Sequence, residues 1–228
     1  MAELSIVIPT YNAARMLGPT LALLAQIESV GLIKEVVVAD GGSTDHTVAI
    51  AREAGALVVI SNLGRGQQLK TGASVATGAW LLFLHADTLL EAGWSEVVRE
   101  FIGHPNTRGM AGYFRFALGD HTPMARRLER TVHWRNRVLA LPYGDQGLLL
   151  SKSLYEHIGG YRPLQLMEDV DLIRRIGRRR LRQLGATAIT SAERYRKEGY
   201  LQRSARNLIC LGLYYLGVPT RLILWLYE

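Results

Sequence analysis

The 228-residue chain is 48% hydrophobic and 21% charged, a composition typical of a globular protein and not of a disordered one, and its single cysteine, Cys210, excludes an internal disulfide framework. Its net charge is +7, and the basic excess lies in residues 121–228, because residues 1–120 hold more acidic than basic side chains. A basic half favours an anionic partner, but no zinc pattern, RNP-type motif or helix-turn-helix signature accompanies it, so we expect no nucleic-acid partner.

Residues 1–102 alternate short apolar runs with segments of helical spacing. We expect strands at 4–8, 33–39, 57–60 and 80–84 and helices at 13–29, 43–54, 66–77 and 91–102. Near-continuous apolar strands with helices between them predict an α/β fold, with a mostly parallel central sheet flanked by helices. Ligands bind such sheets at the carboxyl ends of the strands. The polar residues that follow three of these strands, at 10–12, 40–42 and 85–87, should therefore converge on one crevice.

The second half is less regular. It predicts strands at 109–118, 146–150 and 187–191, the last at an edge, and helices at 122–139, 152–158 and 169–180. We expect one domain over residues 1–200 and an apolar helical appendage over 201–228.

The appendage contains a strongly apolar run at residues 208–227. This run approaches the roughly 20 residues of a membrane-spanning helix, but Pro219 and Arg221 interrupt it. Two options stay open: contact with a membrane surface, or packing on the domain or on a second subunit as a homodimer. The first residues lack the basic start and long apolar run of a signal peptide. We therefore expect a cytoplasmic protein, with a peripheral place on the cytoplasmic membrane face as an option.

Asp87 and Asp40 each follow a predicted strand. A carboxylate at position 87 can hold a hard divalent cation on a diphosphate, or cap the helix expected near residue 91. For His85 we favour a structural role over that of a second ligand. Asp40 can accept hydrogen bonds from a base or ribose, or belong to a plain turn. Asp45 is interpreted as a first-turn acid that favours the helix dipole.

Two further segments carry charged candidates. The loop at residues 64–68 places Arg65 at a helix N-terminus, which suits an anion or simply leaves an exposed arginine. Glu168, Asp169 and Asp171 lie within four positions. Such a cluster can supply a general base, or it can be an acidic helix start that the dipole favours.

Four segments together resemble family 2 glycosyltransferases of the GT-A fold. They are IVIPTYN at 6–12, VVVADGGSTDHT at 36–47, GAWLLFLHADT at 78–88 and GGYRPLQLMEDVDLIRRI at 159–176. Each is weak alone, but their order and spacing are specific. Within the family, the segments GRGQQL, FLHADT, YGDQG and LMEDVDL and the Arg-rich apolar tail are similar to the compact arsenosugar-biosynthesis or selenodomain-associated branch.

This resemblance implies an inverting, hexosyltransferase-type enzyme that moves a sugar from a nucleotide-diphosphate sugar to an acceptor hydroxyl. Asp87 matches the last acid of the family's DxD motif and would bind Mn²⁺ or Mg²⁺ on the diphosphate. Asp169 matches the aspartate of the ED motif and would be the general base. The nucleotide-sugar site would contain Pro9, Thr10, Tyr11, Asn12, Asp40, Gly41, Arg65, Gln68, His85, Ala86 and Asp87. The acceptor and diphosphate side would contain Asp145, Gln146, Glu168, Arg194 and Arg196.

The sequence departs from the family pattern at two acidic positions. His85 stands where the DxD motif has its first acid, and Gly41 where the usual DDGS run has its second. No histidine follows His157, although many relatives offer one as a further metal ligand, so the cation is expected to bind more weakly or to share its work with cationic side chains.

Two rival functions are weighed. A nucleotidyltransferase would carry a glycine-rich basic loop after the first strand, where this chain has PTYN at residues 9–12. A non-catalytic sugar-nucleotide-binding protein is disfavoured by the presence of Asp40, Asp87 and Asp169.

Overall fold

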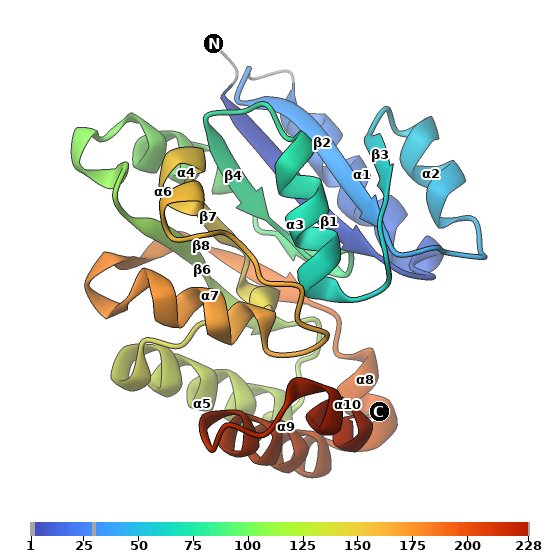
Figure 1. The fold of residues 1–228 in the computed structure, drawn as a ribbon, viewed down its shortest axis with the longest axis vertical. Helices are drawn as coiled ribbons and strands as arrows, with labels where there is room; N and C mark the ends of the chain where they lie inside the picture. Colours follow the sequence, from blue (N-terminus) through green and yellow to red (C-terminus); the bar gives the residue numbers. More distant parts are fainter. Residues whose placement is uncertain (1–2, 29–30, 228) are drawn as a thin grey trace.

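A central sheet organises the protein in the computed structural model, which describes residues 3–28 and 31–227 (Figure 1). Within these residues the sheet has eight strands in the order β3-β2-β1-β4-β7-β6-β8-β5. The strands are β1 Leu4–Thr10, β2 Ile33–Asp40, β3 Leu57–Ile60, β4 Trp80–Phe83, β5 Thr88–Leu90, β6 Ala111–Leu118, β7 Leu148–Ser151 and β8 Leu181–Thr190. The helices are α1 Ala14–Glu28, α2 Thr47–Glu53, α3 Arg65–Val75, α4 Trp94–Gly103, α5 Pro123–Leu139, α6 Lys152–His157, α7 Glu168–Ile176, α8 Glu193–Glu198, α9 Tyr200–Tyr215 and α10 Thr220–Tyr227.

The sheet is parallel through its first half and mixed beyond it. Strands β3, β2, β1 and β4 pair in parallel, β7 pairs antiparallel to both β4 and β6, and β8 runs parallel to β6 and antiparallel to β5. The parallel strands end on one side, so the residues that follow β1, β2 and β4 lie at a common edge. The predicted mostly parallel α/β fold is confirmed.

Apolar side chains fill both faces of the sheet, which explains the near-continuous apolar strands. Along β1, Val7 belongs to one core cluster, whereas Ile6 and Ile8 belong to the other, as the two-residue period of a strand requires. Helix α3 lies directly on the first face. A Cβ on Gly72 would stand 2.5 Å from Val7 Cγ1, so only glycine allows this close approach.

Several predicted boundaries are wrong, and each has a local cause. Strand β1 continues through Pro9 to Thr10. Beyond Val7 only β2 still pairs with it, and a residue without an N–H is tolerated there. Helix α2 begins at Thr47, four residues late, because the preceding loop is engaged in side-chain hydrogen bonds. Helix α4 begins at Trp94, because residues 88–90 form the unpredicted strand β5. The predicted end of the first helix at Ser29 lies outside the described residues.

Strand β8 also differs from its prediction. It begins at Leu181, six residues earlier than expected, and it lies between β6 and β5 instead of at an edge. The edges of the sheet within the described residues are β3 and β5.

The predicted appendage forms α9 and α10, with a break at Gly217, Val218 and Pro219. Gly217 has a φ of 83°, and Pro219 cannot continue the preceding helix. Leu211 of α9 and Ile223 of α10 are buried in the same core cluster as Ile173 of α7, so both helices pack on the body of the protein. Among the helices of residues 3–28 and 31–227, none is both long and apolar enough to cross a bilayer.

Candidate active site

A cavity of about 420 Å³ opens where the loop after β4 meets the start of α7, and it extends between α5 and α9. The sheet edge supplies one wall, the turn at residues 144–146 a second, and the C-terminal helices a third. Seven of the residues predicted for the site line this cavity: Arg65, His85, Asp87, Asp145, Glu168, Asp169 and Arg194. The fold thus joins segments that are far apart in the sequence.

Asp169 lies at the first turn of α7 and is held by two backbone groups. The Gly144 N–H donates to its Oδ2 at 2.8 Å, and the Val170 N–H donates to its Oδ1 at 2.7 Å. A Cβ on residue 144 would stand 2.8 Å from His85 Nε2, so a larger residue there would require the imidazole to move. Asp87 enters the same cavity from the β4 side. It precedes strand β5 and not a helix, so the alternative role as a helix cap is wrong.

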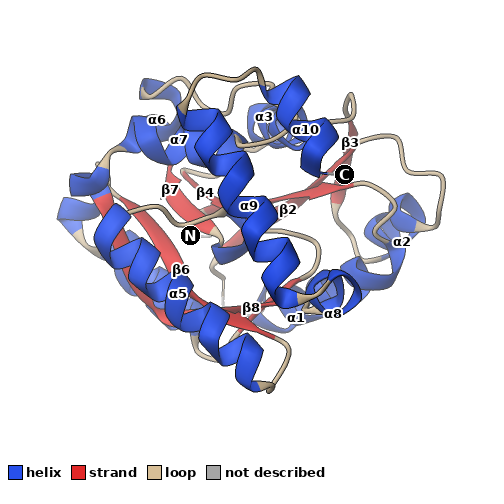
Figure 2. Cartoon of the chain, turned by 90° about the horizontal axis from the view of Figure 1, so that it is seen from below, coloured by secondary structure: helices blue, strands red, loops and turns tan. Residues whose placement is uncertain are grey.

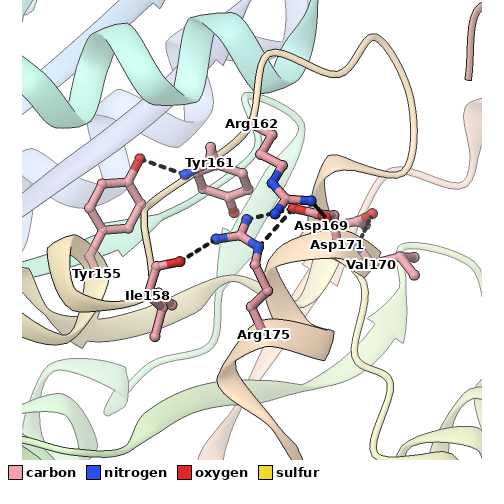
Figure 3. Close-up of polar contacts among 8 residues, drawn as sticks. All are labelled: Tyr155, Ile158, Tyr161, Arg162, Asp169, Val170, Asp171 and Arg175. Carbon is pink, nitrogen blue, oxygen red and sulfur yellow. Dashed lines mark hydrogen bonds and ion pairs between the residues drawn. The ribbon is translucent and has the colours of Figure 1, made fainter.

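The start of α7 is anchored by a second carboxylate, which the sequence analysis left without a role of its own (Figure 3). Asp171 accepts from Arg162 Nη1 at 3.1 Å and from Arg175 Nε at 3.0 Å, and Arg175 Nη1 also donates to the Ile158 carbonyl at 2.6 Å. These contacts tie α7 to the loop before it. Asp171 therefore fixes the helix turn that carries Asp169, and it does not line the cavity.

Glu168 forms a buried ion pair with Arg65. The Arg65 Nε lies 3.1 Å from Glu168 Oε1, whereas Glu168 Oε2 is buried with no hydrogen-bond partner in the described chain. Burial raises the pKa of Glu168 to about 7, and the Arg65 guanidinium opposes that rise. The Glu168 carboxylate in turn raises the pKa of Arg65 above its ordinary value. The arginine is therefore a permanent cation at the cavity wall.

Asp145 and His85 have pKa values shifted in opposite directions. Burial raises the pKa of Asp145 to about 6, opposed by Arg135 and reinforced by Asp169 and Asp87. Its Oδ1 is buried and has no hydrogen-bond partner within residues 3–28 and 31–227. Burial lowers the pKa of His85 to about 3, helped by Arg65 and Arg194. The imidazole is therefore neutral at physiological pH.

The loops after β1 and β2 form a separate, internally bonded unit. Asp40 Oδ1 accepts from the Thr10 and Ser43 hydroxyls, and its Oδ2 accepts from the backbone N–H groups of Gly42 and Ser43, at 2.6–3.0 Å. A carboxylate offers about four such positions, so the loop itself fills them. The buried Gln68 Nε2 donates to the Thr10 and Ala39 carbonyls at 2.6 and 3.1 Å.

Further hydrogen bonds join the loop after β1 to the loop after β2. Asn12 Oδ1 accepts from the Thr44 N–H at 2.9 Å, and its own N–H donates to Ser43 Oγ at 2.8 Å. Asp45 accepts from the Thr47 and Ala14 N–H groups. It thus lies just before α2 instead of within its first turn.

Some predicted site residues lie away from the cavity. In the described chain, the cavity wall does not include these residues: Pro9, Thr10, Tyr11, Asn12, Asp40, Gly41, Gln68, Ala86, Gln146 and Arg196. Tyr11 follows the carboxyl end of β1 and is 50% exposed. Gln146 is fully buried, donates to the Phe114 carbonyl and accepts from Asn136 Nδ2. These partners turn the Gln146 side chain into the core and away from the cavity.

Arg196, which was predicted for the diphosphate side, likewise does not line the cavity in the described chain. Its Nη2 donates to the Gly119 carbonyl at 2.8 Å, and its Nε lies 3.4 Å from Asp120 Oδ2. Arg194, two residues earlier on the same helix, does line the cavity. Positions two apart on a helix do not share a face, so only one of the two arginines can reach it.

The cavity also has an aromatic and apolar wall, which no sequence motif indicated. The Arg135 guanidinium stacks 3.5 Å from the centroid of Tyr143, and Tyr195 stacks on Tyr200 with their centroids 5.4 Å apart. Burial raises the pKa of both Tyr143 and Tyr195 to about 12, so both phenols are neutral hydrogen-bonding groups. A signal existed in the recurring apolar positions 124, 128 and 132 of the Arg-rich helix.

The donor groups fit a divalent cation that a substrate helps to hold. No cluster of three or more His, Cys, Asp or Glu side chains in residues 3–28 and 31–227 could bind a metal alone. Mg²⁺ sites commonly use only one or two carboxylates and complete the shell with substrate phosphates and water. Asp87 meets that requirement, and the neutral His85 is in the state that a nitrogen ligand needs.

Comparison with known proteins identifies the family. The model described as "Glycosyl transferase family 2" matches residues 5–164. A PGL/p-HBAD biosynthesis glycosyltransferase of Mycobacterium bovis is 40% identical over 107 residues, which cover 43% of this chain and 41% of that protein. The dolichyl-phosphate beta-glucosyltransferase of Drosophila melanogaster is 38% identical over 101 residues, covering 37% and 31%. The matched segments thus span less than half of these curated relatives.

Solved structures share the fold. Glucosyl-3-phosphoglycerate synthase from Mycobacterium tuberculosis, crystallised with Mn²⁺, UDP and glucosyl-3-phosphoglycerate, superposes with a TM-score of 0.59 at 20% identity and covers 96% of this chain and 81% of that one. Mannosyl-3-phosphoglycerate synthase from Rubrobacter xylanophilus gives a TM-score of 0.61 at 18% identity, covering 95% and 76%.

Proposed function

Because this chain belongs to glycosyltransferase family 2, we propose that it transfers a sugar from a nucleotide-diphosphate sugar to an acceptor hydroxyl, with inversion at the anomeric carbon. The observation that carries the proposal is the meeting of Asp87 and Asp169 in one cavity. One carboxylate is available on the diphosphate side and the other on the acceptor side. The neighbour crystallised with Mn²⁺ and UDP-glucose supports the donor class.

In the proposed reaction Asp169 is the general base. Its carboxylate takes the proton of the acceptor hydroxyl while that oxygen attacks the anomeric carbon from the face opposite the diphosphate. The bond from the anomeric carbon to the diphosphate oxygen breaks, and the nucleoside diphosphate leaves with the electron pair. The hydrogen bond from the Gly144 N–H to Asp169 Oδ2 would orient the carboxylate for this step.

Arg65 and Arg194 would stabilise the negative charge that develops on the leaving diphosphate, since both cations line the cavity. Asp87, with His85 beside it, would hold Mn²⁺ or Mg²⁺. When bound, such a cation supplies Lewis-acid stabilisation of the phosphate oxygens.

Within the family, we retain the compact arsenosugar-biosynthesis or selenodomain-associated branch as a proposal, on the four segments that carry the resemblance. A cytoplasmic place of action also stays a proposal. The nucleotidyltransferase and non-catalytic alternatives are not favoured, since the matched family and the curated relatives are glycosyltransferases.

Calorimetry with nucleoside diphosphates and their sugar conjugates, with and without Mn²⁺, tests the donor assignment. We expect at least one sugar nucleotide to bind more tightly with Mn²⁺, and Asp87→Ala to remove that metal-dependent gain, a loss of roughly tenfold or more. The exposed Glu91 offers a control, and Glu91→Ala should bind as the wild type does. Unchanged Mn²⁺-dependent affinity in Asp87→Ala would contradict the metal assignment.

A further inference from the structure

The cavity continues away from the carboxylates into a groove between α5 and α9. Figure 2 shows these two helices on the same side of the molecule, with α9 crossing near α5, and residues of both line the cavity. We name the apolar part of its wall the α5–α9 groove. Its lining residues are Met124, Leu128, Val132, Trp134 and Leu139 on α5, and Leu201, Leu208 and Leu211 on α9.

This groove is open to solvent although its wall is apolar. Trp134 is 60% exposed, Leu208 is 64% exposed and Leu201 is 75% exposed. On α5, positions 124, 128, 132 and 139 recur at spacings of four and seven, and on α9, positions 201, 208 and 211 recur at spacings of seven and three, so one face of each helix is turned to the groove. Contiguous exposed apolar surface of this kind marks a place where an apolar ligand or partner binds.

We propose that the acceptor is an amphiphile, with a hydroxyl-bearing head group at Asp169 and a long apolar chain in the α5–α9 groove. The inference rests on the proposed glycosyl transfer, whose acceptor it specifies. Continuity identifies the occupant: the groove and the carboxylates Asp145 and Asp169 belong to one cavity. A second copy of the protein or a bilayer could cover the exposed side chains, but neither would place a reactive hydroxyl at the inner end.

The polar end of the cavity offers a hydrogen-bond acceptor for a head-group hydroxyl. Asp145 Oδ1 is buried with no hydrogen-bond partner among the described residues, and such an acceptor is satisfied by a ligand hydroxyl. The carboxylates Asp87, Asp145, Glu168 and Asp169 share this end with Arg65 and Arg194, which the proposed reaction assigns to the diphosphate.

Tryptophan fluorescence provides a direct binding assay. Trp80 and Trp94 are buried, at 3% and 0% exposure, and Trp225 is exposed outside the groove. In a Trp225→Phe background, Trp134 therefore reports the groove. We would titrate butyl, octyl and dodecyl β-D-glucosides below their micellar concentrations and follow the emission of Trp134.

The affinity should rise by at least about tenfold from the butyl to the octyl glucoside, since each buried methylene contributes strongly, with a blue shift of the Trp134 emission. Leu208→Asp places a charge in the wall and should weaken dodecyl glucoside binding by about tenfold or more. Ile209→Asp is the matched control, because Ile209 is 54% exposed on the same helix and is not part of the cavity wall in the described chain. It should bind as the wild type does.

Three outcomes would overturn the proposal. The first is equal affinity for butyl and dodecyl glucosides. The second is an equal loss of dodecyl glucoside affinity in Leu208→Asp and Ile209→Asp, which would indicate general surface adhesion. The third is tighter binding of dodecyl phosphate than of dodecyl glucoside, which would contradict the hydroxylated head group. Nucleotide binding measured on the same samples separates the two proposals. Nucleotide binding without chain-length dependence overturns the amphiphilic acceptor alone, and chain-dependent binding without nucleotide binding overturns the transferase assignment.

Discussion

Asp40, at the loops after β1 and β2, differs from Asp145 and Glu168 of the cavity in how many hydrogen bonds its carboxylate receives. In the loops, Asp40 receives four hydrogen bonds from neighbouring chain atoms. In the cavity, Asp145 Oδ1 and Glu168 Oε2 are buried without a hydrogen-bond partner in the part of the chain that the structure describes. The hydrogen bonds of Asp40 hold the loops in place, whereas the unpartnered oxygens of Asp145 and Glu168 can still accept hydrogen bonds from a ligand.

The two kinds of carboxylate are therefore expected to have different roles, one in stability and the other in binding or catalysis. A buried carboxylate without a full set of partners is unfavourable for folding, and such groups concentrate where a protein binds or reacts. The loop carboxylates should therefore affect stability first and catalysis only through it. The cavity carboxylates should affect catalysis or its pH dependence while the fold is retained.

The largest expected effect is on turnover in Asp169→Asn. Removing the general base should lower kcat by about 10²–10⁴-fold, while the affinity for the sugar nucleotide stays unchanged, because the donor is assigned to the Asp87 side of the cavity. Steady-state kinetics and donor calorimetry on the same preparation measure both. The exposed Glu156 on α6 gives the control Glu156→Gln, which should keep full activity. Wild-type turnover in Asp169→Asn would refute the base assignment.

The second effect is on stability, in Asp40→Ala. Removing the acceptor of four hydrogen bonds leaves the Gly42 and Ser43 N–H groups without their partner, so we expect the free energy of unfolding to fall by about 2–4 kcal/mol. Urea denaturation measures this change. Asp40→Asn keeps one acceptor oxygen and should lose less.

The same pair of variants tests whether Asp40 also contacts the nucleotide. If Asp40→Asn lost donor affinity while keeping near wild-type stability, Asp40 would be a direct ligand, and the contrast between loops and cavity would fail at this residue.

How far the sequence predicts this molecule follows from the range of each interaction. Apolar periodicity is local, so the strands of the first half and most helices are predicted within a few residues. Strand β5 has only three residues, too few for a period to appear. Strand β8 includes Gly185, its burial alternates only from Leu184 onward, and its first residues follow a run of arginines.

The candidate site divides along the same line. Residues tied to a strand end or a helix start, such as Asp87 and Asp169, were predicted because the sheet topology fixes where those ends meet. The directions in which the Gln146 and Arg196 side chains point were not predicted, because each is set by a partner distant in sequence. These partners are the Phe114 carbonyl for Gln146 and Asp120 for Arg196. The apolar wall of α9 was predicted as a tail of undecided role, since periodicity alone does not say what a helix faces.

The smallest expected effect is a change in how stability depends on pH, and it concerns Glu168. Its ordinary pKa of 4.5 is raised to about 7 in the folded protein, by burial, against Arg65 of α3 and with Asp169 of α7 adding to the rise. Below pH 4.5 both the folded and unfolded states hold the proton. Between 4.5 and 7 the unfolded state has released a proton that the folded state keeps, so the free energy of unfolding falls as the pH rises. Above 7 both states are ionised, and the contribution stays constant.

Glu168→Gln removes this titration while keeping an oxygen for Arg65. Between about pH 5 and pH 7 the wild type should lose roughly 2 kcal/mol of unfolding free energy relative to the variant, as urea denaturation at several pH values would measure. Glu91→Gln, at an exposed position after β5, should keep the wild-type slope. If Glu168→Gln kept that slope too, Glu168 would be ionised throughout this range as an ordinary partner of Arg65. The unpartnered Oε2 would then no longer distinguish the cavity from the loops, and Asp145 alone would carry that distinction.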